Sequence, residues 1–192
     1  KDFWSWNPAT NVWTQVADFG GTARSAAVAF AIGSLGYVAT GFDNSLKKDV
    51  WAYDPSLNSW AQKADFGGSA RHFATGFELN GYGYIGTGTG AGNFKDLWQY
   101  NPVTDTWTQK ANFGGVARSS AASFAVDGKG YLGIGFGTSS ALSDFWEYDP
   151  ATDTWTQKAN FGGGTRSDAV AFSICDKGYI ATGVSGSDKK DI

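Results

Sequence analysis

The phrase TDTWTQKANFGG occurs twice without change, at residues 104–115 and 152–163. Looser copies, TNVWTQVADFGG and LNSWAQKADFGG, stand at residues 10–21 and 57–68. The tryptophans of the four copies are 47, 47 and 48 residues apart. A fixed period of this length means that one supersecondary unit is copied along the chain. The fold therefore has to be an array of similar units.

A second marker, Asp-x-Trp, opens each unit. It stands at Asp2, Asp49, Asp96 and Asp144, each preceded by Lys or Ser. The repeats therefore span residues 1–47, 48–94, 95–142 and 143–189, and residues 190–192 start a further repeat. A chain of 192 residues is expected to form one domain, here residues 1–192. The sequence does not start with Met, which suggests a mature or excised piece of a longer chain.

Each repeat is predicted to contain four short strands. In the first repeat, residues 2–6 (DFWSW) alternate as a strand does, and the segment around Trp13 forms the second strand. Asn7-Pro8 indicates a turn between them, because the Asx side chain accepts a hydrogen bond from the backbone two residues on. Phe-Gly-Gly predicts a tight corner in which glycine takes positive φ. Small residues 25–32 (SAAVAFAI) form the third strand, and GYVATG forms the fourth.

The composition fits an all-β protein. Aromatic residues make up 16% of the chain, and 27 glycines separate the aromatic segments. Asn80-Gly81 and Asp127-Gly128 are strong hairpin signals between the third and fourth strands. A unit of four antiparallel strands suits a propeller blade better than a solenoid coil, which is usually shorter. The small-residue strand is expected innermost, where blades crowd at the axis.

The spacing of the aromatic residues resembles that of kelch-repeat β-propellers. Tyr53-Asp54-Pro55 is followed by Trp60 with six residues between Tyr and Trp, and the same spacing recurs in every repeat. The chain departs from the kelch double glycine, because Thr40, Thr87, Ile134 and Thr182 replace the first glycine. The resemblance implies a structural core role for the repeated tryptophans Trp4, Trp13, Trp51, Trp60, Trp98, Trp107, Trp146 and Trp155.

The kelch strand order also implies how the blades divide along the chain. This chain then starts at the third strand of a blade and contains three whole blades plus two half-blades, at residues 2–19 and 166–183. The fold class expected is an all-β, kelch-like β-propeller with four blades' worth of sequence. Three arrangements stay open: the halves join and close a four-bladed ring, the chain is a fragment of a larger propeller, or half-blades are exchanged between chains.

An arginine follows each Phe-Gly-Gly corner, at Arg24, Arg71, Arg118 and Arg166. At the starts of innermost strands, these residues would ring one mouth of the central channel and hold an anion through bidentate hydrogen bonds. The alternative is that each arginine binds a backbone carbonyl or the repeated aspartate. Invariance in every repeat favours this structural alternative.

The connections between the fourth strand and the next repeat vary while the rest of the repeat barely changes. Variable loops on a rigid scaffold are typical places for recognition. The candidate binding residues in them are Phe42, Asp43, Asn44, Asn93, Phe94 and Phe136. The only histidine, His72, stands where other repeats have serine and is a further candidate at the channel mouth.

Catalytic and metal chemistry finds little support in the sequence. One His and one Cys build neither a metal site nor a nucleophile with its base. The only two glutamates, Glu78 and Glu147, lie in different repeats. Asp105, Asp153 and Asn11 near the Asx-Pro turns lack the spacing of a calcium loop. We therefore expect no enzyme activity, no cofactor and no metal.

The sequence predicts a non-enzymatic interaction scaffold that presents variable loops on one face of a propeller. Two alternatives are a structural subunit that exchanges half-blades between chains and a lectin-like carbohydrate-binding domain. The partner expected is a protein or a second copy of the chain. The net charge of -3 argues against nucleic acid, and no apolar run is long enough to span a membrane. Gly/Thr/Trp-rich repeats fit an extracellular or cell-surface location, with a cytosolic scaffold as the open alternative.

Overall fold

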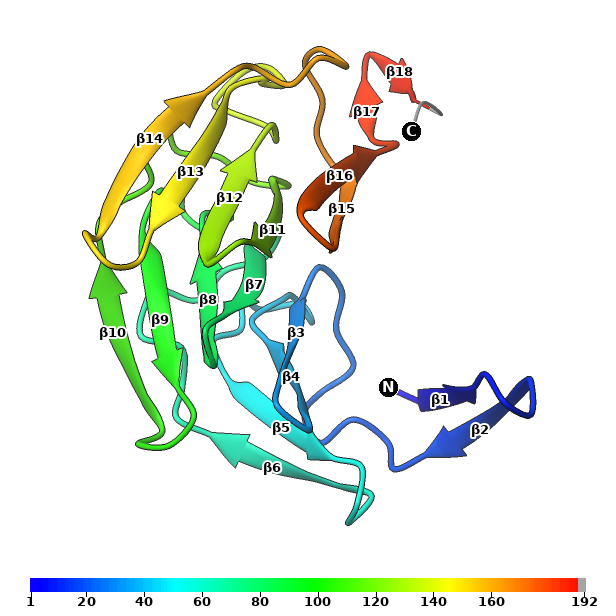
Figure 1. Ribbon diagram of the computed structural model, residues 1–192. Helices are drawn as coiled ribbons and strands as arrows, with labels where there is room; N and C mark the ends of the chain where they lie inside the picture. Colours follow the sequence, from blue (N-terminus) through cyan, green and yellow to red (C-terminus); the bar gives the residue numbers. More distant parts are fainter. Residues whose placement is uncertain (190–192) are drawn as a thin grey trace.

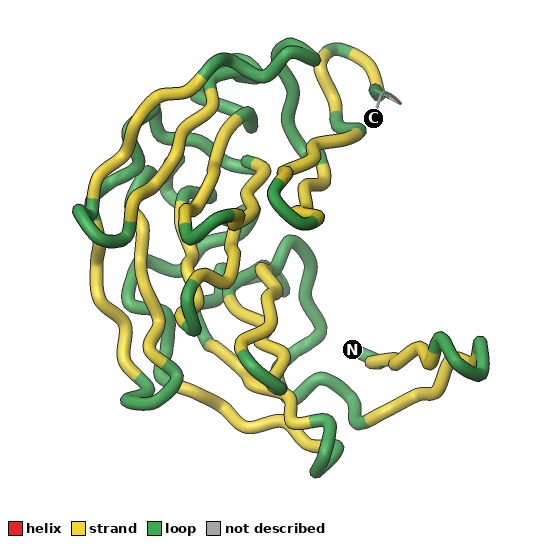
Figure 2. Tube along the Cα trace, viewed as in Figure 1, coloured by secondary structure: helices red, strands yellow, loops and turns green. Residues whose placement is uncertain are grey.

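The computed structural model describes residues 1–189 of the chain, all of them in strands, turns and loops (Figures 1 and 2). The predicted further repeat at residues 190–192 lies outside the described residues. The strands are β1 (Phe3–Asn7), β2 (Val12–Val16), β3 (Val28–Ile32), β4 (Leu35–Ala39), β5 (Val50–Asp54), β6 (Ser59–Lys63), β7 (Thr75–Leu79), β8 (Tyr82–Gly86), β9 (Leu97–Asn101), β10 (Thr106–Lys110), β11 (Ala122–Val126), β12 (Lys129–Gly133), β13 (Phe145–Asp149), β14 (Thr154–Lys158), β15 (Val170–Ile174), β16 (Lys177–Ala181), β17 (Val184–Ser185) and β18 (Ser187–Asp188).

Three whole blades stand side by side in an arc (Figure 1). Their four-stranded antiparallel sheets have the orders β3-β4-β5-β6, β7-β8-β9-β10 and β11-β12-β13-β14. Each blade takes its inner hairpin from one repeat and its outer hairpin from the next. The propeller fold and the division into three whole blades and two half-blades are therefore as predicted.

The two half-blades remain separate in this chain. β1 pairs with β2 in one two-stranded sheet, and β15 pairs with β16 in another. They lie at the two ends of the arc (Figures 1 and 2). Within residues 1–189, the ring is therefore not closed by pairing between β16 and β1. The short hairpin β17–β18 was not predicted from the sequence.

The small-residue strands β3, β7, β11 and β15 are innermost, as expected (Figure 1). Neighbouring blades approach closely there, and the ring of Phe77 in β7 lies against Gly130 in β12 of the next blade. The inner strand begins later than expected, at Val28 instead of Ser25, because Ala26 has a left-handed backbone with φ of 51°.

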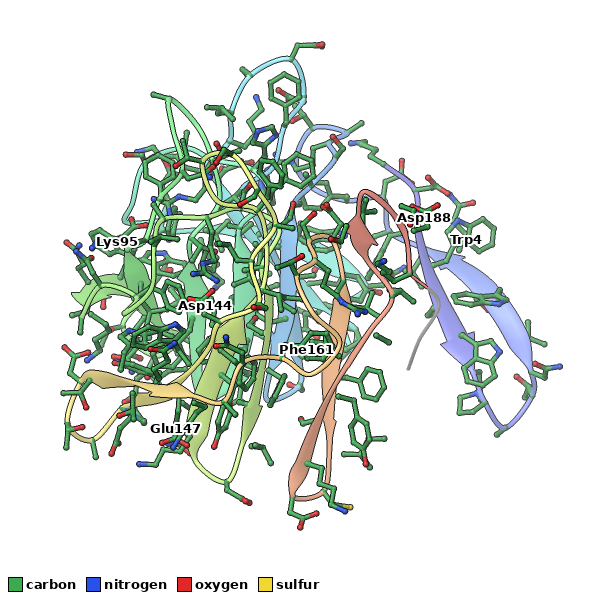
Figure 3. The ribbon with its side chains drawn as sticks, turned by 90° about the horizontal axis from the view of Figure 1, so that it is seen from above. Trp4, Lys95, Asp144, Glu147, Phe161 and Asp188 are labelled. Atoms are coloured by element: carbon green, nitrogen blue, oxygen red, sulfur yellow. The ribbon has the colours of Figure 1, made fainter. Side chains whose placement is uncertain are left out.

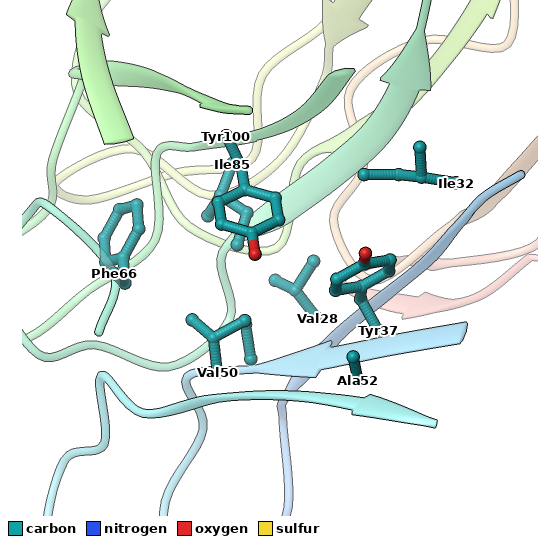
Figure 4. Packing of buried hydrophobic residues seen from close by; sticks show 9 residues of the cluster. Val28, Ile32, Tyr37, Val50, Ala52, Phe66, Ile85 and Tyr100 are labelled. Carbon is teal, nitrogen blue, oxygen red and sulfur yellow. The ribbon is translucent and has the colours of Figure 1, made fainter. Parts of the chain in front are cut away.

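The core lies between blades. One buried cluster joins Val28 and Tyr37 of the first whole blade to Ile85 and Tyr100 of the second (Figure 4). The rings of Tyr37 and Tyr100 meet edge to face, with centroids 5.6 Å apart, a favoured arrangement for aromatic pairs. Packed side chains therefore join neighbouring blades, together with backbone hydrogen bonds between loop segments, whereas strands within a blade are joined by backbone hydrogen bonds.

The predicted turns form as the sequence indicates. Asn80 and Gly81 both have positive φ, as a type I′ hairpin turn requires. At the Asx-Pro turns, the side-chain oxygen of Asp54 accepts a hydrogen bond of 2.8 Å from the backbone N–H of Ser56. The same contact recurs at Asn7, Asn101 and Asp149.

The predicted role of the Phe-Gly-Gly glycines was wrong. Gly67 and Gly68 do not have positive φ; instead, neighbouring side chains occupy the space that a Cβ would need. A Cβ at Gly67 would lie 2.6 Å from the Trp98 ring, and one at Gly68 would lie 2.8 Å from the guanidinium of Arg71. Close packing therefore requires glycine at both positions.

The interface between blades gives a matched test. In Gly130→Ala, the new methyl group would meet the Phe77 ring at 2.6 Å, and we expect destabilisation by about 1–3 kcal/mol from overpacking. Gly36→Ala, at the same repeat position, meets no atom within 4 Å and should leave the stability of the monomer unchanged or raised. Urea unfolding of both variants at low protein concentration measures the difference; equal destabilisation would contradict this packing.

Candidate functional site

The repeated arginines are anchors inside the blades. Arg71 donates from Nη1 to Oδ1 of Asp96 at 2.6 Å and from Nη2 to Oδ2 at 2.7 Å. Nη1 also donates to the carbonyl of Thr87 at 2.7 Å, and Nε donates to that of Ser69 at 2.9 Å. The same bidentate pairs form between Arg24 and Asp49 and between Arg118 and Asp144.

Aromatic rings surround these ion pairs. The guanidinium of Arg71 lies 4.8 Å from the centroid of Phe66 and 4.1 Å from that of Phe94. Asp96 also accepts a hydrogen bond from the indole of Trp98 at 2.8 Å. The side chains of Arg71 and Arg118 are fully buried. The charge of Arg24, Arg71 and Arg118 is therefore met by the repeated aspartate of the next repeat, which is the structural alternative that the sequence favoured over a ring of anion-binding guanidinium groups.

Arg166 occupies the equivalent position at the end of the arc. It is buried, and its guanidinium lies 4.7 Å from the centroid of Phe161. Nη1 donates to the carbonyl of Thr182 at 3.0 Å. This contact matches that of Arg71 with Thr87, so Arg166 is built into the scaffold in the same way.

The residues that replace the kelch double glycine contribute to these anchors. Thr40, Thr87, Ile134 and Thr182 have positive φ between 48° and 62°. The carbonyls of all four accept hydrogen bonds from the neighbouring arginines. The backbone therefore keeps the conformation that glycine would favour.

Burial and hydrogen bonding act in opposite directions on the anchoring carboxylates. Burial raises the pKa of Asp144, but hydrogen bonds from Arg118 and Trp146 and the charge of Arg118 outweigh this and hold it below its usual value of 3.8. The pKa of Asp49 is lowered in the same way against burial, by Arg24 and Trp51.

The repeated tryptophans form two kinds of structural hydrogen bond. Trp51, Trp98 and Trp146 each donate to the anchoring aspartate. Trp60, Trp107 and Trp155 each donate across to a carbonyl of the preceding repeat, as in the 3.1 Å bond from Trp60 to Ala17. Trp4 donates to Asp2, and Trp13 is 64% exposed at the free end of the arc.

Asp105 and Asp153, the aspartates near the Asx-Pro turns, also hold blades together. Asp105 accepts hydrogen bonds from the hydroxyl of Tyr100 at 2.7 Å and from the backbone N–H of Ala64 at 2.9 Å. Asp153 makes the corresponding contacts with Tyr148 and Ala111. Residues 1–189 contain no group of three or more His, Cys, Asp or Glu residues that could hold a metal ion.

The loop after β4 is fixed by its own polar side chains. Asp43 forms a salt bridge of 2.9 Å with Lys47 and accepts hydrogen bonds from Thr22 and Ser45. The Lys47 contact, followed by those of Thr22 and Ser45, lowers the pKa of Asp43 far below its usual value. Asn44 has φ of 78° and is exposed. Asp43 therefore shapes the loop, and Asn44 and Phe42 are left accessible on it.

The β8–β9 loop is hydrogen-bonded to the β12–β13 loop. Asn93 donates from Nδ2 to the carbonyls of Phe136 and Gly137, at 3.1 and 3.0 Å. Phe94 packs over Arg71. Of the loop candidates, Asn93 and Phe94 thus have structural contacts, whereas the side chains of Phe42 and Phe136 are 38% and 42% exposed.

The structure gathers candidate residues on one face, which we call the loop face. It consists of the β4–β5, β8–β9 and β12–β13 loops and the segments that enter β3, β7, β11 and β15 (Figure 3). Backbone bridges join the two kinds of segment, as between Ser25 and Phe42 and between His72 and Thr89. The His72 ring lies between those of Phe42 and Phe73, with centroid distances of 5.6 and 4.6 Å.

Four positions on the loop face were missed in the sequence analysis. Ala26, Phe73, Ser120 and Asp168 directly precede the small residues that line the central channel. All four have φ between 51° and 56°, and N–H···O=C bonds connect them in order around the channel mouth. The residue type at these four positions varies between repeats while the neighbouring residues change little, and this variation was the signal that the sequence offered.

The described residues form no helix of the length and apolarity needed to cross a membrane.

The two glutamates also have local structural contacts. Glu147 binds Lys158 and Tyr131, and Glu78 accepts a hydrogen bond from the N–H of Gly81 in its own hairpin turn.

The Arg118–Asp144 anchor makes stability depend on pH. The carboxylate stabilises the fold when it is ionised, so its contribution is present above its unfolded-state pKa of 3.8 and is lost as pH falls through the lower folded value. At pH 7, Asp144→Asn should lose about 3–5 kcal/mol, because it leaves Arg118 buried without its counterion. Urea unfolding from pH 7 to 2 should show this difference shrinking below pH 4, roughly the usual pKa of aspartate.

Asp127→Asn, in an exposed hairpin turn, is the control and should follow the wild type at every pH. A difference between wild type and Asp144→Asn that is constant across the pH range would contradict the stabilising role of the ionised anchor.

Comparison with known proteins agrees with the geometry. Residues 130–162 match the kelch motif, and no curated protein matches the sequence. The solved structure described as "Structure of YjhT", a kelch-type propeller, is similar with a TM-score of 0.79 and 21% identity. The similarity covers 90% of this chain but 63% of YjhT, so the chain spans less than two thirds of that protein's length. At this identity the likeness shows the fold alone, so the chain has a kelch-like propeller fold, and the match to the kelch motif is confined to residues 130–162.

Proposed function

We propose that the chain is a non-enzymatic binding scaffold that recognises a protein partner through the loop face. The observation that carries this proposal is Phe73. Its φ is 51°, a left-handed conformation that is unusual for a bulky residue. Its side chain is nevertheless 42% exposed at the channel mouth.

Packing does not explain Phe73. Thr40, Thr87 and Ile134 also have positive φ, but they are fully buried, so packing compensates for their conformations. At the turns between the outer strands the chain uses Asn or Asp in this conformation, at Asn11, Asn58, Asp105 and Asp153, and the positions equivalent to Phe73 carry the smaller residues Ala26, Ser120 and Asp168. An exposed phenylalanine held in a strained conformation is the kind of outlier that supports a functional role.

The surroundings of Phe73 suggest what the partner brings. Phe42, His72 and Phe73 form a row of rings from the β4–β5 loop to the channel mouth. Asp168 is exposed at the same mouth, while the nearby arginines are buried in ion pairs. An exposed aromatic row on the same face as an exposed carboxylate favours a peptide segment with apolar and basic side chains.

The carbohydrate alternative has less support. Trp4, Trp6 and Trp13 are the large exposed indoles, at 46%, 49% and 64%. They lie on the β1–β2 half-blade, where equivalent residues of whole blades are covered by a neighbour. Their exposure therefore reflects the open end of the arc.

Phe73→Asn tests the proposal with two opposed readouts. Asparagine tolerates the left-handed backbone, so the variant should gain about 1 kcal/mol in free energy of unfolding. Peptides selected from a random phage-displayed library on the wild-type chain should bind the variant at least about tenfold more weakly, the size of a single interface hot spot.

Phe73→Tyr keeps the ring and should retain binding without the gain in stability. Val103→Ser removes an equally apolar side chain, 90% exposed on the outer turn between β9 and β10, and should change neither property. Selected peptides that bind wild type and Phe73→Asn equally, or a library that yields no peptide dependent on Phe42 or Phe73, would overturn the proposal.

A further inference from the structure

The two half-blades carry complementary surfaces that the loop-face function does not use. The three whole blades of the same chain show how an inner hairpin of one repeat and an outer hairpin of the next fit together. We propose that β1–β2 of a second copy of this chain completes the blade begun by β15–β16, so that copies associate end to end.

The hydrogen-bonding edge of β16 matches edges that are occupied elsewhere. In the whole blades, Gly36 pairs with Tyr53, Gly83 with Tyr100, and Gly130 with Tyr148. β16 has the same Gly-Tyr start but pairs only with β15 among the described strands. An open edge of this kind is a template for a further strand. The whole blades fix its register: Gly178 opposite Trp6, Tyr179 opposite Ser5, Ile180 opposite Trp4 and Ala181 opposite Phe3 of the second copy.

In the whole blades, one face of the inner hairpin is covered by the following blade. The corresponding face of β15–β16 is apolar and exposed. Phe77 and Phe124, which pack on glycines of the following blade, are 5% and 8% exposed. Their counterpart Phe172 is 45% exposed, and Val170 and Ile174 beside it are 56% and 55% exposed.

The glycine that would receive Phe172 is at the other end of the chain. Gly36 in β4 is equivalent to Gly83 and Gly130, each of which lies under a phenylalanine of the preceding blade. No atom lies within 4 Å of the Cβ position of Gly36. A second copy whose β1–β2 hairpin joins β16 would bring its β3–β4 hairpin next to Phe172.

The outer strands carry a matching set of polar contacts. In each whole blade, the indole of the outer tryptophan donates to an alanine carbonyl of the preceding blade, as Trp155 does to Ala111 at 3.1 Å. The Asx residue before it accepts from the N–H of the same alanine, as Asp153 does at 2.9 Å. The corresponding residues at the ends of the arc are Trp13, Asn11 and Ala159, and all are exposed.

These surfaces belong to opposite ends of one molecule. The partner's β1–β4 would meet β14–β16 of the first copy, so the contact is heterologous. Such contacts form rings if the rotation closes and filaments if it does not. The half-blades of one chain form separate sheets at the two ends of the arc (Figure 1), and the β1–β2 hairpin of a second copy can reach β16 without rearranging the three whole blades.

Cysteine pairing tests the contact and its register. Two variants of the 192-residue chain, Ser5→Cys and Tyr179→Cys, are made in a Cys175→Ser background, mixed and oxidised. Directly opposed residues of an antiparallel pair are close enough for a disulfide. We expect a crosslinked dimer containing one chain of each kind. Ile180→Cys mixed with Ser5→Cys is the control, since neighbouring residues of a strand point to opposite faces, and it should crosslink at least about tenfold less.

Light scattering and a double variant complete the test. The mass of the wild-type chain should rise with concentration above 20.4 kDa, and Gly36→Ala should weaken association at least about tenfold without unfolding the monomer. Gly92→Ala, in an open loop position, should associate like the wild type. A monomer at every concentration would overturn the proposal. So would a Ser5→Cys/Tyr179→Cys double variant that crosslinks only within one chain, which would mean that the chain closes on itself.

Discussion

The buried pair between arginine and aspartate is the interaction on which each blade depends. Arg71 stands before β7 and Asp96 before β9, so their bidentate contact joins the entry of the inner hairpin to that of the outer hairpin. The carbonyl of Arg71 also accepts a hydrogen bond from the N–H of Gly41 in the preceding blade, at 2.9 Å. One residue therefore fixes the two halves of a blade and links that blade to its neighbour.

The anchor also explains the phrase that repeats most faithfully. The phenylalanine of Phe-Gly-Gly packs under the guanidinium, the first glycine makes room for a tryptophan, and the second makes room for the guanidinium itself. A fully buried guanidinium requires nearly complete pairing, because the penalty for desolvating an unpaired charge is large. A change in Phe-Gly-Gly would expose the arginine or crowd it, and all four repeats keep these three residues.

The sequence predicted the propeller, the division into blades and most turns, because these follow from periodicity and local turn chemistry. It predicted the wrong reason for Gly67 and Gly68, since close packing between distant side chains cannot be read from spacing. The partner of Arg71 was one of two stated alternatives, and only the fold shows that Asp96 is within reach. Phe73 and Asp168 were missed because the residue types Ala, Phe, Ser and Asp do not reveal a left-handed backbone at a strand entry, so their variation between repeats was the one signal that the sequence offered.

The structure divides the variable residues of the loop face into those that make structural contacts and those that are exposed without them. Asn93 and Asp43 lie in variable loops but are used for loop-to-loop and local contacts. The side chains of Phe42, Phe73 and Phe136 are exposed on the same face and form no such polar contacts. Sequence variation alone did not distinguish these two groups.

Each blade is shared between two successive repeats, and this has a consequence for how such a chain changes in evolution. Every junction along the arc is built from the same contacts, so duplicating or deleting one 47-residue unit would regenerate a junction that already exists. Unequal recombination between the nearly identical gene segments could therefore alter the number of blades without inventing a new interface. The identity of residues 104–115 and 152–163 is what a recent duplication of this kind would leave.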